Sequence, residues 1–157
     1  MQPCCDMLTI SNALRGEVMN DHIEGGCLCG KVEYSIENEF MFVLFCHCEQ
    51  CRRISGSAHA SNLFSATDSL CWKSGGEFIT NFHHPSRDFT KAFCSECGSG
   101  LPYVLKDGSM VIVPAGSLNS EPHFGKTANV FLSERANWSP SVNETEEFDH
   151  FPSYFSE

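Results

Sequence analysis

The chain has 157 residues, a formal net charge of −10 with neutral histidines, and a hydrophobic content of 41%. This length suits one compact domain with a hydrophobic core, and we expect no second folded domain. The negative charge opposes contact with phosphate backbones, so we expect no nucleic-acid partner. Residues 1–16 show no charged leader before a long apolar run, so we expect no secretory signal, no membrane span and a reducing, cytoplasmic environment.

The first 21 residues show no sustained hydrophobic period, and we interpret residues 1–21 as an N-terminal arm. Short strand patterns begin near Gly25. Val32, Tyr34 and Ile36 alternate with polar residues, which predicts a strand with one buried face. Residues 40–45 are apolar on both faces and predict a central strand.

The later apolar runs are short and are separated by Gly, Pro, Asn or Asp. They predict strands at 60–64, 70–73, 78–82, 101–105, 110–113 and 130–132. Asp107 and Gly108 predict a hairpin turn, because such turns need positive φ. No segment shows a long helical period. We therefore expect an all-β domain over 22–139 and a peripheral acidic and aromatic tail over 140–157, which Phe148, Phe151, Tyr154 and Phe155 could attach to the domain.

Seven of the ten cysteines form three tight groups. These groups are Cys27 with Cys29, Cys46 with Cys48 and Cys51, and Cys94 with Cys97. Thiolates this close repel one another unless a soft cation neutralises them, and zinc is the usual intracellular solution. Five disulfides in a secreted protein, or cysteines that are merely small buried residues, are the alternatives; the missing signal and the ligand-like spacing favour zinc.

The spacing also indicates which side chains face a metal. Residues i and i+2 of an extended chain point to the same side, so Cys27 and Cys29 can share one ion, as can Cys46 and Cys48. His47 then points away from the ion and is expected beside the site. Cys94 to Cys97, followed by a glycine, is typical of a zinc-knuckle turn.

Several pairings of the groups are compatible with the spacing. Two halves from different parts of the chain, Cys27/Cys29 and Cys94/Cys97, would complete one structural tetrahedron. The three remaining cysteines would leave a second zinc with an open corner, as catalytic zinc requires. The candidates for its fourth ligand are water, a substrate thiol, a histidine, Cys71, Cys4 or Cys5.

Two arginines, Arg52 and Arg53, directly follow Cys51. They could soften the negative field of a three-thiolate zinc or hold a substrate carboxylate. The alternative is a solvated pair with no special role.

Five motifs resemble the glutathione-dependent formaldehyde-activating enzyme family, which also contains centromere protein V. The resemblance extends over about 25–138. The motifs are GCLCG at 26–30, CHCEQCR at 46–52, GSA at 56–58, FCSECGS at 93–99 and AGSLN at 115–119.

The resemblance implies a small, zinc-stapled, β-tent-like fold of packed antiparallel sheets. It matches Cys27, Cys29, Cys94 and Cys97 to the ligands of a structural zinc, and Cys46, Cys48 and Cys51 to those of a catalytic zinc. The activity of the family is the joining of formaldehyde to glutathione to give S-(hydroxymethyl)glutathione, which is classed as a carbon–sulfur lyase reaction. The chain departs from the family in its first twenty or so residues, in its acidic tail, and at Lys91, where an arginine is expected.

Our leading hypothesis is an enzyme that activates a glutathione-like thiol at the second zinc and adds it to a small aldehyde. Arg52, Arg53 and His59 are the candidate substrate-binding residues, and His47 or His59 could handle the proton on the carbonyl oxygen. The alternatives are a non-catalytic zinc-binding interaction module, as in centromere protein V, and a redox or zinc-buffering protein. Exposed strand edges make a homodimer a further prediction.

Overall fold

The structure is a computed structural model that describes residues 22–139 and 145–152. The predicted arm at 1–21 lies outside the described residues, as do Cys4, Cys5, Tyr154 and Phe155. The described chain is built mostly of strands and confirms the all-β prediction. No helix in this part of the chain has the length and apolar character needed to cross a membrane.

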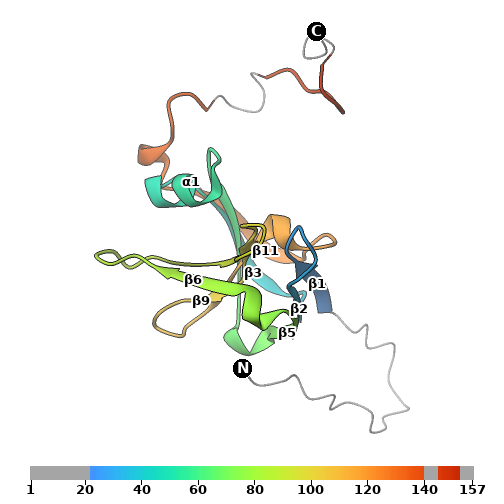
Figure 1. The fold of residues 1–157 in the computed structure, drawn as a ribbon. Coiled ribbons are helices and arrows are strands. Elements are labelled where there is room, and N and C mark those ends of the chain that lie inside the picture. Colours follow the sequence, from blue (N-terminus) through green and yellow to red (C-terminus); the bar gives the residue numbers. More distant parts are fainter. Residues whose placement is uncertain (1–21, 140–144, 153–157) are drawn as a thin grey trace, which may run out of the picture.

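The strands form three sheets (Figure 1). The first sheet has the order β1-β2-β5, with β1 (His22–Gly26), β2 (Glu33–Glu37) and β5 (Leu70–Ser74). The central sheet has the order β11-β3-β4-β10-β9, with β11 (Phe124–Val130), β3 (Phe40–Cys46), β4 (Ala60–Ser65), β10 (Val111–Pro114) and β9 (Tyr103–Val104). The third sheet has the order β6-β7-β8, with β6 (Ile79–His83), β7 (Thr90–Cys94) and β8 (Gly100–Leu101).

Five short helices connect these strands in the described chain. They are α1 (Glu49–Ser55) and the 3₁₀ turns η1 (Thr67–Ser69), η2 (Gly76–Phe78), η3 (Ala115–Ser117) and η4 (Leu132–Glu134). The helix α1 joins β3 to β4 and lies beyond the end of the central sheet (Figure 1). It therefore places the second cysteine group at that end of the sheet.

Two apolar clusters hold the sheets together. The larger one lies between the first and central sheets, where Tyr34 and Ile36 of β2 pack with Leu63 and Val113 of the central sheet. The smaller one joins the start of the domain to the third sheet. Its members are Cys27, Val32, Ala92, Cys94 and Leu101. Two of the predicted metal ligands thus belong to the core itself.

The predicted strand elements are largely confirmed. In β2, Tyr34 and Ile36 are buried while Glu33 and Glu37 are exposed, although Ser35 is buried as well. The strand β3 is interior to the central sheet, between β11 and β4.

The predicted turn follows β9. Gly108 has a φ of 72°, and the Leu105 N–H donates to the Met110 carbonyl at 2.9 Å. The Asp107–Gly108 hairpin is therefore confirmed.

Several features differ from the expectation. The predicted strand at 101–105 is wrong as a single strand, because β8 ends at Leu101, β9 begins at Tyr103, and the two belong to different sheets. The sequence predicted no helix, but α1 forms directly after Cys48. The sheets are not purely antiparallel, because β11 pairs with β3 in parallel. The predicted strand at 130–132 is wrong: β11 ends at Val130, Phe131 adopts a left-handed conformation with φ of 58°, and η4 follows.

Candidate metal centres

Four cysteine sulfurs meet where the first and third sheets join. Cys27 and Cys29 lie in the turn between β1 and β2, while Cys94 and Cys97 lie at the turn between β7 and β8. All four sulfurs lie within 4.8 Å of one another, with 3.4 Å between Cys27 and Cys29 and 3.9 Å between Cys29 and Cys94. Four sulfurs at about 2.3 Å from a tetrahedral zinc are about 3.8 Å apart. This four-sulfur set fits a zinc ion.

The two turns that carry this set are alike in their backbone. Gly30 and Gly98 both have a φ of 75°, a conformation that glycine adopts without strain. The Gly30 N–H donates to the Cys27 carbonyl at 3.0 Å, and the Gly98 N–H donates to the Cys94 carbonyl at 2.9 Å. Each glycine curls the chain behind its cysteine pair, so the sulfurs point to a common centre.

Ser99 is a residue of this site that the sequence reasoning did not single out. Its Oγ accepts the Leu28 N–H at 3.0 Å and lies 3.3 Å from the Cys97 sulfur. Hydrogen bonds from Ser99 lower the pKa of the Cys97 thiol to about 6. A thiol that is ionised near neutral pH is ready to bind a metal without first releasing a proton. The position directly after Gly98 is the signal that could have identified it.

Three further sulfurs meet at the end of β3. Cys46 ends β3, Cys48 caps α1, and Cys51 lies in the first turn of α1. Their sulfurs lie within 4.8 Å of one another, with 3.5 Å between Cys46 and Cys48. The Cys51 N–H donates to the Cys48 sulfur at 3.5 Å. Among the described His, Cys, Asp and Glu residues, none joins this three-sulfur set as a fourth ligand, and Cys71 lies elsewhere in β5.

Two thiols of the three-sulfur set, Cys46 and Cys51, need a nearby cation to ionise. Burial raises the pKa of Cys46, and burial together with the neighbouring sulfurs of Cys46 and Cys48 raises the pKa of Cys51. The Cys46 and Cys51 thiols therefore remain protonated until a positive charge compensates them. An all-sulfur donor set suits zinc, so both sets could hold metal ions.

His47 lies outside the three-sulfur set. Its Nε2 is 3.0 Å from Asn129 Oδ1 of β11, and its ring centroid is 5.2 Å from that of His59. Its Nδ1 is buried without a hydrogen-bond partner in the described part of the chain. Its backbone is held by β11 as well, because the His47 N–H donates to the Val130 carbonyl at 3.0 Å. The structure therefore places His47 against β11 and not among the metal ligands.

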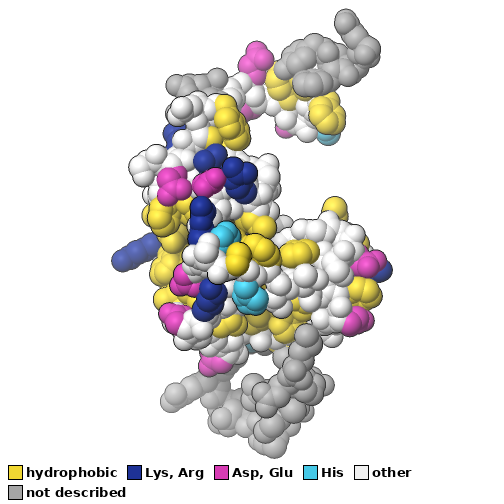
Figure 2. Space-filling view, turned by 60° about the vertical axis from the view of Figure 1, so that its left-hand side comes forward, with side chains coloured by type: hydrophobic (Ala, Val, Ile, Leu, Met, Phe, Trp, Pro, Cys, Tyr) yellow, Lys and Arg dark blue, Asp and Glu magenta, His cyan; other side chains and the backbone are white. Residues whose placement is uncertain are grey.

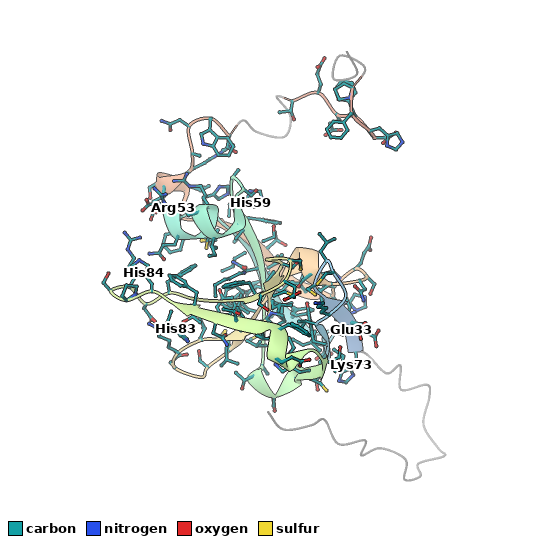
Figure 3. The ribbon with its side chains drawn as sticks, in the orientation of Figure 1. Glu33, Arg53, His59, Lys73, His83 and His84 are labelled. Atoms are coloured by element: carbon teal, nitrogen blue, oxygen red, sulfur yellow. The ribbon has the colours of Figure 1, made fainter. Side chains whose placement is uncertain are left out.

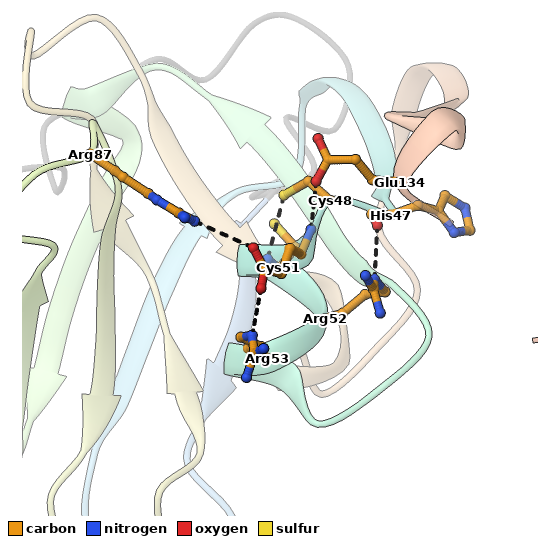
Figure 4. Close-up of polar contacts among 8 residues, drawn as sticks. His47, Cys48, Cys51, Arg52, Arg53, Arg87 and Glu134 are labelled. Carbon is orange, nitrogen blue, oxygen red and sulfur yellow. Dashed lines mark hydrogen bonds and ion pairs between the residues drawn. The ribbon is translucent and has the colours of Figure 1, made fainter. Parts of the chain in front are cut away.

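The two predicted arginines line a cleft beside α1. The Arg52 Nε donates to the His47 carbonyl at 3.1 Å, and Arg53 pairs with Glu49 at 3.0 Å (Figure 4). The cleft has a volume of about 520 Å³. Its lining residues are Glu49, Arg52, Arg53, Gly56, Ser57, Glu134 and Trp138. His59 also lies beside α1 (Figure 3) but does not line this cleft.

Two acidic contacts shape this region, and neither was predicted from the sequence. Glu134 of η4 accepts the Glu49 N–H at 2.9 Å, and Arg87 approaches the Glu49 carboxylate at 3.7 Å from the segment between β6 and β7 (Figure 4). Glu134 and Arg87 are both more than 30 residues from α1 in the chain, so no local sequence pattern could predict these contacts. On this side of the molecule basic and acidic side chains are interspersed and form no continuous basic patch (Figure 2).

Comparisons with known proteins agree with this geometry. A search of curated proteins finds no significant match. A crystal structure of a Rhodobacter sphaeroides protein is similar in fold, with a TM-score of 0.54 and 21% identity over 68% of this chain and 99% of that chain. The sequence profile of the glutathione-dependent formaldehyde-activating enzyme family matches residues 22–134, which span both cysteine sets. The chain therefore belongs to the glutathione-dependent formaldehyde-activating enzyme family.

Proposed function

We propose that this protein joins a thiol such as glutathione to a small aldehyde such as formaldehyde, as a zinc-dependent carbon–sulfur lyase of the S-(hydroxymethyl)glutathione synthase type. In this proposal the four-sulfur set holds a structural zinc and the three-sulfur set holds a catalytic one. One observation carries the proposal. Three sulfurs converge at the end of β3, and no fourth described ligand closes the group, which leaves a position for a substrate sulfur.

What zinc supplies when bound at such a site is a lower pKa for a thiol that approaches it. The chain's own residues would orient that thiol. Arg52 is fixed at its Nε by the His47 carbonyl and lines the cleft. Arg53 shares the same cleft, so a substrate carboxylate can lie between two guanidinium groups.

The proposed step balances without an oxidant. The thiol loses its proton, its sulfur forms a bond to the aldehyde carbon, and the π electrons of the C=O bond move to oxygen. That oxygen then takes up one proton, so the product is a thiohemiacetal. His59 is the proposed proton carrier, because burial and the nearby His47 and Arg135 lower its pKa and keep it neutral near pH 7. His47 is the second candidate, because its Nδ1 has no partner in the described chain.

We place the protein in the cytoplasm, because free thiols at ligand spacing need a reducing compartment. A homodimer is also part of the proposal. The strand β11 lies at the end of the central sheet, and six of its seven residues are exposed. An open strand edge of this length offers unpaired backbone groups to a second chain.

The test removes one sulfur of the three-sulfur set and keeps the helix cap. In Cys48→Ser, the serine oxygen can still cap α1, because serine is a preferred N-cap residue, but the soft metal ligand is lost. We expect the purified variant to hold one zinc per chain where the wild type holds two. Its thiol-dependent consumption of formaldehyde should fall at least about a hundredfold, with an unchanged fold by circular dichroism.

Wild-type turnover in Cys48→Ser would overturn the proposal. Two other outcomes would redirect it. Stable binding of two zinc ions without any aldehyde consumption would identify a non-catalytic interaction module. Rapid zinc release with thiol oxidation, with or without glutathione, would identify a zinc-buffering protein.

A further inference from the structure

A second cleft lies between α1 and the β6–β7 hairpin, and the proposed reaction assigns no role to it. Its volume of about 390 Å³ is within the range of small-molecule sites. The lining includes Arg53 and Ile54 of α1 and Phe82, His84, Arg87 and Phe89 of the hairpin. Figure 3 shows Arg53 and His84 on these two elements. We call this space the hairpin cleft.

Apolar side chains line the hairpin cleft from both of its sides. Ile54 of α1 and Phe82 of β6 are each 40% exposed, although large apolar side chains are usually buried. The ring of Phe82 meets that of His84 edge-on, with 6.2 Å between their centroids. The His84 N–H donates to the Phe89 carbonyl at 2.9 Å, which holds these two lining residues side by side. This arrangement suits a flat apolar group between the helix and the hairpin.

The polar groups of the hairpin cleft are mainly hydrogen-bond donors. Arg53 and Arg87 approach the two oxygens of the Glu49 carboxylate, at 3.0 Å and 3.7 Å (Figure 4). The Ser86 N–H donates to Nδ1 of His84 at 3.2 Å, so the neutral imidazole carries its proton on Nε2 and is a donor there. Among the described residues that line the cleft, Glu49 is the only acidic one. Each of its oxygens already faces an arginine, so the lining lacks a further anion for these donors.

The charge of the hairpin cleft is opposite in sign to that of the whole protein. With a neutral histidine, its two arginines exceed Glu49 by one positive charge, whereas the chain carries −10. Asp88 follows Arg87 in the chain but pairs with Lys106 at 3.4 Å and does not line the cleft. Exposed ion pairs are weak, so Arg87 can exchange its loose contact with Glu49 for two parallel hydrogen bonds to a ligand carboxylate.

We propose that the hairpin cleft is a binding site for a small organic anion with an aromatic body, such as an aryl carboxylate. The carboxylate lies at Arg87, and the ring lies between Ile54 and Phe82. Arg53 also lines the cleft of the proposed thiol substrate, whereas Arg87 lines the hairpin cleft and not the other. The inference goes beyond the proposed reaction and depends on neither metal ion nor on turnover.

The experiment titrates the zinc-loaded, full-length protein with 2-naphthoate and follows its backbone amide signals by NMR. We expect saturable shifts in α1 and in the hairpin, with a Kd of about 1 mM or tighter, which is typical of a ligand of this size. The probe 2-naphthamide keeps the ring without the charge, and acetate keeps the charge without the ring. Each of these two should bind at least about fivefold more weakly than 2-naphthoate.

Two pairs of variants locate the ligand. Arg87→Met should weaken the binding of 2-naphthoate about tenfold, whereas Arg52→Met, which changes the other cleft, should alter it less than about twofold. Phe82→Ala should weaken it about fivefold, because the ring contact is lost. Phe124→Ala should leave it unchanged, because this phenylalanine of β11 is 46% exposed but does not line the cleft.

Three results would overturn the inference. They are the absence of saturable shifts at about ten times the expected Kd, equal affinity for 2-naphthamide, and a loss of affinity in Arg52→Met as large as that in Arg87→Met. None of these readouts measures aldehyde consumption. A protein that binds 2-naphthoate in this way but consumes no aldehyde would therefore contradict the proposed reaction and leave the hairpin cleft standing as a binding site.

Discussion

The two histidines beside the three-sulfur set differ in what surrounds them. His47 is fixed between β3 and α1, with one ring nitrogen against Asn129 and the other without a partner in the described chain. His59 precedes β4, where its ring meets the edge of Phe45 at 5.4 Å and the ring of His47 at 5.2 Å. The surroundings of His59 disfavour its protonation.

We predict that His59 titrates below its ordinary value of 6.5, because burial, His47 and Arg135 all disfavour the protonated ring. Since the folded pKa is lowered, the unfolded chain binds more protons just below pH 6.5, and the stability of the fold decreases as the pH falls through this range. Arg135→Gln removes one positive charge and should raise the pKa of His59. NMR titration of the His59 imidazole resonance measures its pKa in the wild type and in the variant. A wild-type pKa at or above 6.5 would contradict the prediction.

At the scale of elements, the sequence predicted the features that depend on neighbouring residues. The alternation in β2, the apolar run of β3 and the Asp107–Gly108 turn each depend on neighbouring residues, and all three are present. The cysteine groups are local in the same sense. Spacing of two or three residues already brings the sulfurs of one group together, and the structure joins the groups into a set of four and a set of three.

What the sequence did not predict depends on distant contacts. The helix α1 is only seven residues long, too short for a hydrophobic period, and it is held by the Cys48 cap and by Glu134. The strand β7 has little alternation and is defined by pairing with β6 and β8 on its two sides. Arg87 and Glu134 likewise reach the cleft region from segments far away in the chain.

Two glycines with positive φ should differ in their tolerance of alanine. Gly56, which ends α1 with a φ of 62°, has no atom within 4 Å of an added Cβ. Gly75, with a φ of 73°, would place its Cβ 1.9 Å from the Lys31 carbonyl oxygen. Gly56→Ala should therefore lower the free energy of unfolding by about 1 kcal/mol, and Gly75→Ala by about 3 kcal/mol or more. Urea denaturation of the zinc-loaded variants measures these free energies. Equal losses of stability in the two variants would show that positive φ alone, and not the close contact at Gly75, determines the cost of alanine.

At the scale of the whole molecule, the two cysteine sets have different surroundings. The four-sulfur set connects the turn after β1 to the end of β7, and so joins the first sheet to the third. Cys27 and Cys94 also belong to the smaller apolar cluster, together with Val32, Ala92 and Leu101. The three-sulfur set instead lies where β3 meets α1, beside a helix with no buried residue. Loss of a ligand from the four-sulfur set should therefore disturb the packing of the core. Loss of a ligand from the three-sulfur set should leave that packing intact.

This difference predicts unequal effects on thermal stability. In Cys94→Ser, a fully buried sulfur is replaced by a hydroxyl group that binds zinc poorly, so the metal link between the sheets and part of the core are lost together. The melting temperature should fall by more than about 10 °C, because binding of a structural zinc contributes directly to folding. Cys48→Ser should lower it by less than half as much, since serine still caps α1. Thermal unfolding followed by circular dichroism, with zinc content measured beside it, compares the two. If they melt at the same temperature, or if a strong chelator leaves the wild-type melting temperature unchanged, the four-sulfur set does not hold the sheets together.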